Sequence, residues 1–160
     1  MLINLAIFKC LARCDIMRGM TNPDTSKDNA QDNSGSLYGL VGGDQKLREL
    51  VDRFYDLMDL EPDFVALRAM HPPSLDMSRD KLYHFLSGWT GGPDLYTPRY
   101  GNAFLRARHL PFAIGTSARD QWLTCMVLAM QECEISEDKQ DILLEAFFRT
   151  ADWMRNKPDN

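Results

Sequence analysis

The sequence has few cysteines, and none of them are spaced as a metal site requires. The four are Cys10, Cys14, Cys125 and Cys133, and no two form a Cys-x-x-Cys pair. Structural zinc sites use closely spaced thiolates together with further thiolate or imidazole ligands, so the pattern argues against structural zinc. We expect free thiols, as in a reducing cytoplasm, with Cys10 and Cys14 open to incidental oxidation.

An excess of positive charge and a long apolar run are also missing. The 160 residues include 18 Lys and Arg against 23 Asp and Glu, for a net charge of −5. This balance argues against a general nucleic-acid binder, and no apolar run approaches the roughly 20 residues that span a bilayer. Residues 1–13 are partly apolar but lack the basic start and cleavage site of a signal peptide. We expect a cytoplasmic protein without a transmembrane segment.

The polar stretch 21–36 divides the chain into two parts. It is rich in Asn, Asp, Ser and Thr and has no periodic apolar face, which is typical of a linker. We therefore predict an N-terminal extension and linker over residues 1–36 and one domain over residues 37–160. Three interpretations of residues 1–20 stay open: an amphipathic anchor, a partner-binding segment, or residues upstream of a true start at Met17 or Met20.

Helical spacing dominates the rest of the chain. Apolar side chains recur at steps of three and four in four stretches, and no segment alternates with the period of two that a strand requires. We expect the third of these helices to begin near Ser117 as N-cap, and the fourth to begin after Ser136 and to end at Pro158. The stripes contain Leu47, Leu50, Val51, Phe54 and Met58; Leu82, Phe85, Leu86 and Trp89; Leu123, Met126, Val127 and Met130; and Leu143, Leu144, Phe147, Ala151 and Met154. The fold class is predicted to be all-α, and a plain helical bundle would account for the same stripes.

One of the three histidines lies among residues that suit a metal-bearing cofactor. The local sequence is Arg106-Ala107-Arg108-His109-Leu110-Pro111-Phe112, and Trp122 follows thirteen positions after His109. Imidazole is a common metal ligand, arginines pair with carboxylates, and the Pro-Phe pair ends the local helix and supplies an aromatic wall. A flat, apolar, carboxylate-bearing cofactor with a coordinating metal would use all of these groups. Haem fits that description, and because Cys-x-x-Cys-His is absent it would be held without a covalent bond, as haem b.

From residue 37 to about residue 158 the chain resembles the group II truncated haemoglobins, in which a shortened globin packs as a two-over-two helical sandwich around haem. The elements that carry the resemblance occur in the family's order and at compatible spacing. They are Tyr38-Gly39-Leu40-Val41-Gly42-Gly43, Arg53-Phe54-Tyr55, Phe85-Leu86 with Gly91-Gly92-Pro93, the segment 106–112 and Arg119-Asp120-Gln121-Trp122-Leu123. The His-x-Pro-Phe element with the downstream Trp is the most specific of them. The first 36 residues have no counterpart in the family.

The resemblance assigns roles near the iron. It implies that His109 is the proximal ligand through Nε2, with its other nitrogen donating to a backbone or water acceptor. It implies that Trp122 and Tyr55 donate hydrogen bonds to the iron's ligand on the distal side, and that His71 borders that pocket. His71 would donate to Tyr55 or to the ligand, titrate near neutral pH, or only cap its turn.

The resemblance also predicts how the ring is held. Lys81, Tyr96 and Arg108 match positions that bind the haem propionates, whereas Leu82, Phe85, Phe112 and Ile114 match apolar contacts with the ring. Ser78 stands where conventional globins have a distal histidine, and as a small residue it would leave room for ligand entry or for water. His84 points away on its helix and is expected to be exposed.

Three functions are compatible with these residues. The first is binding of O2, and of NO or CO, at ferrous haem, with chemistry on reactive oxygen and nitrogen species as its purpose. The second is an enzyme, either a nitric oxide dioxygenase or a peroxidase that consumes peroxide, which would need an external reductase because no reductase domain is present in the sequence. The third is a haem-based sensor that uses residues 1–36 to signal to a partner. The sequence separates binding from catalysis poorly, but a donor-rich pocket that holds O2 tightly is a poor delivery device, so we favour the first.

Overall fold

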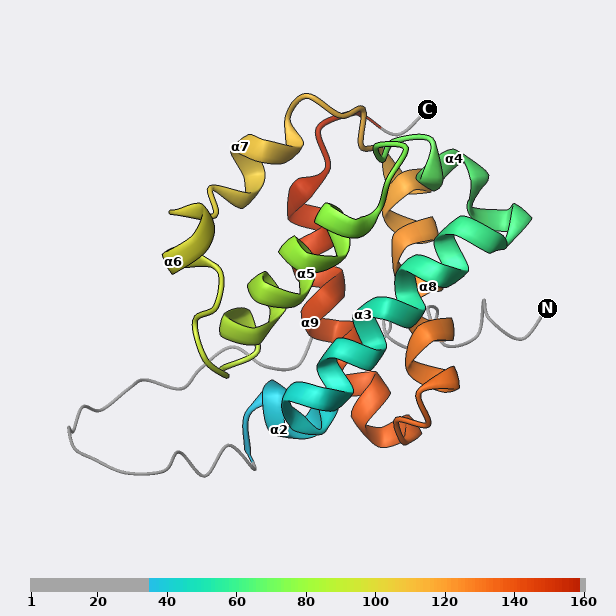
Figure 1. The fold of residues 1–160 in the computed structure, drawn as a ribbon. Helices are drawn as coiled ribbons and strands as arrows, with labels where there is room; N and C mark the ends of the chain where they lie inside the picture. Colours follow the sequence, from blue (N-terminus) through green and yellow to red (C-terminus); the bar gives the residue numbers. More distant parts are fainter. Residues whose placement is uncertain (1–34, 159–160) are drawn as a thin grey trace. The chain divides into compact units, whose positions relative to one another are not determined.

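The computed structural model describes residues 35–158 (Figure 1). In that part of the chain every regular element is helical, which confirms the all-α prediction. The elements are α2 (Leu37–Val41), α3 (Gly43–Leu60), η2 (Pro62–Phe64), α4 (Val65–Arg68), α5 (Asp76–Trp89), α6 (Thr97–Tyr100), α7 (Leu105–His109), α8 (Thr116–Glu132) and α9 (Glu137–Met154). The predictions for residues 1–34, including Cys10 and Cys14, lie outside the described residues. No helix over 35–158 has the length and apolar character to cross a membrane.

Helix α3 runs through the centre of this domain because its predicted apolar stripe is buried. Leu47, Leu50, Val51 and Phe54 have no exposed surface, and Met58 has almost none. The helix starts at a tight corner, where Gly42 ends α2 with a φ of +111°, a conformation that favours glycine. The stripe thus fixes which face of α3 points inward.

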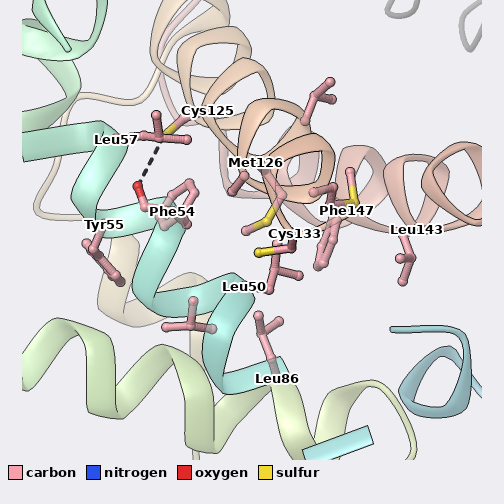
Figure 2. Close-up of a cluster of buried hydrophobic side chains, with 14 of the residues drawn as sticks. Leu50, Phe54, Tyr55, Leu57, Leu86, Cys125, Met126, Cys133, Leu143 and Phe147 are labelled. Atoms are coloured by element: carbon pink, nitrogen blue, oxygen red, sulfur yellow. Dashed lines mark hydrogen bonds between the residues drawn. The ribbon is translucent and has the colours of Figure 1, made fainter. Parts of the chain in front are cut away.

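Two pairs of long helices make up the core. Helix α3 packs against α5 on one side and α8 on the other, and α8 packs against α9. Figure 1 shows α3 and α5 in front of α8 and α9, the two-over-two arrangement that the resemblance implies. Figure 2 shows Phe54, Leu86, Met126 and Phe147, one from each long helix, directed into the same interior. In this view the thiol of Cys125 donates to the backbone carbonyl of Phe54, 3.3 Å away.

The predicted helix ends need two corrections. Helix α8 begins at Thr116 with Gly115 as N-cap, so Ser117 is inside the first turn and its hydroxyl accepts from the amide of Gln121. Helix α9 begins after Ser136 as predicted, but it ends at Met154 and not at Pro158. The residues after Met154 instead leave the helix and contact the loop that follows α7, an arrangement that shapes the candidate site.

Candidate functional site

A cavity of about 630 Å³ opens between α3, α4 and the segment after it, α5, α7, α8 and α9, with Tyr96 just before α6 on its wall. This volume is in the range of about 300–1,000 Å³ that is usual for small-molecule and cofactor sites. All eleven residues proposed from the sequence line it: His109, Trp122, Tyr55, His71, Lys81, Leu82, Phe85, Tyr96, Arg108, Phe112 and Ile114. Ser78 lines it as well. The structure therefore brings together residues that are spread along the sequence from Tyr55 to Trp122.

His109, the last residue of α7, faces the cavity with one ring nitrogen already occupied. Its Nδ1 lies 2.7 Å from the carbonyl oxygen of Leu105, one helical turn earlier. A carbonyl only accepts, so the proton is assigned to Nδ1, and Nε2 of the neutral ring keeps a free lone pair. This is the tautomer that a metal ligand needs, and the backbone bond fixes the orientation of the ring.

His109 has no neighbouring set of metal ligands from the protein. Within residues 35–158 there is no group of three or more His, Cys, Asp or Glu side chains that could hold a metal ion. A metal bound at Nε2 must therefore bring most of its other ligands with it. An iron porphyrin would do so through its four ring nitrogens, and the largely apolar cavity walls would suit the macrocycle.

Asn156, which the sequence did not single out, holds the loop between α7 and α8. Its amide nitrogen donates to the carbonyl oxygens of His109 at 3.2 Å and Phe112 at 2.8 Å, and its Oδ1 accepts from the N–H of Ile114 at 3.1 Å. The backbone N–H of Asn156 also donates to the carbonyl oxygen of Ile114 at 2.9 Å. One side chain thus ties down three cavity-lining residues, and no sequence pattern marks such contacts with the backbone.

Tyr55 and Trp122 lie on the cavity wall with polar hydrogens that no group in residues 35–158 accepts. Their rings are held by Phe54, whose centroid lies 5.1 Å from that of Tyr55 and 5.3 Å from that of Trp122. Burial raises the pKa of Tyr55, although Arg79 nearby opposes the shift, so its hydroxyl stays protonated near neutral pH. The two rings therefore present an O–H and an indole N–H to whatever occupies the cavity.

His71 follows α4 and contacts Tyr55 edge to face, with the ring centroids 5.8 Å apart. Its Nδ1 lies 2.9 Å from the carbonyl oxygen of Leu67, so in the neutral ring Nε2 can only accept. Burial lowers the pKa of His71, and the charge of Arg68 adds to the effect. The neutral ring cannot donate to a ligand through Nε2, which makes donation by His71 the weakest of the alternatives considered for it.

The rim of the cavity has the predicted cations and apolar contacts. Arg108 lies with its guanidinium near the backbone, donating to the carbonyl oxygens of Ala103 at 2.8 Å and Asn102 at 3.4 Å. The rings of Phe85 and Tyr96 meet edge to face at 6.1 Å. The prediction for His84 was wrong in part: its side chain does point away from the cavity, but it is buried, with Nε2 2.7 Å from Nη1 of Arg99 on α6. The packing of α6 over α5 covers it.

Comparison with known proteins agrees with this architecture. Residues 36–156 match the model of the bacterial-like globin family. The group 2 truncated haemoglobin YjbI of Bacillus subtilis (strain 168) is 36% identical over 117 residues, which cover 73% of this chain and 86% of that protein.

Among solved structures, the group II 2-on-2 haemoglobin of Agrobacterium tumefaciens superimposes with a TM-score of 0.72 at 36% identity, covering 84% of this chain and 100% of the other. The group II truncated haemoglobin of Bacillus anthracis gives 0.71 at 34% identity, covering 78% and 94%. The helices, the cavity and these relatives together show that the chain belongs to the group II truncated haemoglobins of the bacterial-like globin family, whose cofactor is haem b.

Proposed function

We propose that His109 holds haem b through Nε2 and that Trp122 and Tyr55 stabilise a diatomic ligand such as O2 on the opposite side of the ring. The observation that carries this proposal is that one cavity contains an imidazole nitrogen with a free lone pair and two donors without an acceptor. When bound, haem supplies a ferrous iron that binds O2, NO or CO. Lys81, Tyr96 and Arg108 would hold the propionates at the rim.

The two donors set the expected lifetime of the complex. A ligand that gains negative charge on binding accepts charge-assisted hydrogen bonds, each worth about 1.5–3 kcal/mol. Because about 1.4 kcal/mol corresponds to a factor of ten, each donor should slow ligand release by roughly 10-fold to 150-fold. Such slow release suits chemistry on the bound ligand better than delivery of O2. We therefore place the function in reactive oxygen and nitrogen chemistry.

The donor assignment is tested by the O2 dissociation rate, measured by stopped flow on the ferrous oxygenated protein. Trp122→Phe and Tyr55→Phe remove the donor hydrogens and keep most of the ring packing, and each should speed release at least about 10-fold. Trp153→Phe is the matched control, because Trp153 is 60% exposed and does not line the cavity. Unchanged rates in both cavity variants would contradict the assignment.

The iron ligand has its own test. His109→Gly should lose the normal Soret spectrum of the ferrous protein, and added imidazole should restore it by entering the space that the side chain leaves. A spectrum that is the same in the variant without imidazole would rule out His109 as the ligand.

The reactive-species function is tested by mixing the oxygenated protein rapidly with NO. Fast formation of ferric protein and one nitrate per haem is expected, since NO would meet O2 held in place by Trp122 and Tyr55. Oxidation on the timescale of O2 release would instead favour a binding protein without this activity. Repeated turnover requires an electron from outside the described domain, because residues 35–158 form only the globin.

A further inference from the structure

Four cations on α5, α6 and α7 have no acidic partner among the described residues. They are Lys81, Arg99, Arg106 and Arg108, here called the basic rim. Eight other Lys and Arg side chains in residues 35–158 form the ion pairs of this part of the chain, and no member of the basic rim takes part. Lys139 and Lys157 also stand outside these ion pairs, so the basic rim contains four of the six such cations in the described residues.

The local sequence explains this imbalance. Between Asp94 and Asp120 there is no acidic residue, although the whole chain has a net charge of −5. Arg106 donates to the carbonyl oxygens of Trp153 and Arg155, and Arg99 contacts the ring of His84. These partners are uncharged, so they do not cancel the positive charges of the two guanidinium groups.

The haem itself would not cancel this field. Its two propionates would meet Lys81 and Arg108, the two members of the basic rim that line the cavity. Arg99 and Arg106 do not line it and would keep their charges. The surplus of positive charge therefore lies on α6 and α7, the helices that precede and carry His109.

Apolar side chains are exposed along the same segment. Phe104 is 67% exposed and Leu110 57%. Leu110 follows His109, which lines the cavity, so these exposed residues adjoin the wall of the cofactor site. Exposed apolar groups among like charges are typical of protein contact sites, and small contact areas are typical of transient redox complexes. Phe104 and Leu110 stand at the two ends of α7, and Figure 1 shows α6 and α7 at the edge of the fold.

We infer that the basic rim and its apolar neighbours dock a separate electron-donor protein that has an acidic face around an exposed one-electron redox group. This inference rests on the proposed function, which needs the iron returned from the ferric to the ferrous state. The donor loses one electron and the ferric iron gains it, with no proton or atom transferred. Charge complementarity would raise the rate of encounter and place the donor against α6 and α7, the helix that carries His109.

The test uses the haem-loaded full-length protein in the ferric state and reduced plant-type [2Fe–2S] ferredoxin, an acidic one-electron donor, mixed anaerobically in a stopped-flow instrument. We expect the second-order rate of haem reduction to fall at least about 10-fold as salt rises from about 0.05 to about 0.5 M, because screening shortens the range of the attraction. At low salt, Arg99→Gln combined with Arg106→Gln should slow reduction several-fold and flatten the salt dependence. Arg149→Gln on α9, which removes a charge that is 71% exposed, is the matched control and should leave the rate unchanged.

Dithionite reduction and O2 binding of each variant separate this inference from the proposed function. Reduction by dithionite and O2 binding should both stay normal in the Arg variants. If the unmodified protein itself failed to bind O2 after reduction by dithionite, the proposed function would be refuted and not the docking inference. Because Arg106 also holds the backbone after α9, Arg99→Gln alone serves if the double variant does not fold. A reduction rate that is independent of salt, an equal loss in Arg149→Gln, or no reduction by ferredoxin where dithionite succeeds would each overturn the docking inference.

Discussion

Replacement of Asn156 should loosen the loop that positions His109, with a cost that follows from its hydrogen bonds. Asn156→Ala removes three side-chain bonds, to the backbone of His109, Phe112 and Ile114. At about 1 kcal/mol for each bond, the loss in the free energy of unfolding is about 2–4 kcal/mol. For a chain of this size, that corresponds to a fall in Tm of about 5–15 °C. Asn156→Asp should cost as much, because a carboxylate would face two carbonyl oxygens.

The assay combines stability with a signal from the iron ligand. Thermal unfolding of the haem-loaded protein gives Tm, and resonance Raman spectra of the ferrous, ligand-free protein give the iron–histidine stretching band. A looser loop should shift or broaden that band, because the carbonyl of His109 loses its anchor. Lys157→Ala is the control, since the Lys157 side chain is exposed and makes none of these contacts. An unchanged Tm and band in both Asn156 variants would refute the reasoning.

Three further predictions concern the packing and the titration of the domain. Gly92→Ala should destabilise by about 1–3 kcal/mol, measured by denaturant unfolding, because the new Cβ would lie 2.5 Å from the ring of Tyr38. Burial lowers the pKa values of His71 and His84, so below about pH 6.5 the unfolded chain binds more protons than the folded one and Tm should fall as the pH drops; a flat profile would contradict this. Burial raises the pKa of Cys125 to about 12, so native protein at pH 8 should protect this thiol from iodoacetamide, as peptide mapping would show.

The sequence predicted the long helices because their packing repeats along the chain. The stripe of α3 is visible as a period, and it is buried as expected. The cavity residues were found through the family resemblance, since nothing local ties Tyr55 to Trp122. The exposure of His84 was predicted wrongly because its burial depends on α6, whose position over α5 is a long-range contact. Asn156 was missed because hydrogen bonds to backbone groups leave no periodic signal.

Helices α6 and α7 differ from the long helices of the domain in a way that affects folding. Neither contains a buried residue, although their neighbours Tyr96 and Ile114 are buried at the cavity. Such helices have almost no hydrophobic core of their own, and short helices are marginal in water without tertiary support. Haem held by His109 would supply apolar contacts to this stretch, and part of its binding energy would then stabilise the fold there. The segment that supplies His109 would thus gain order from the same cofactor that His109 is proposed to hold.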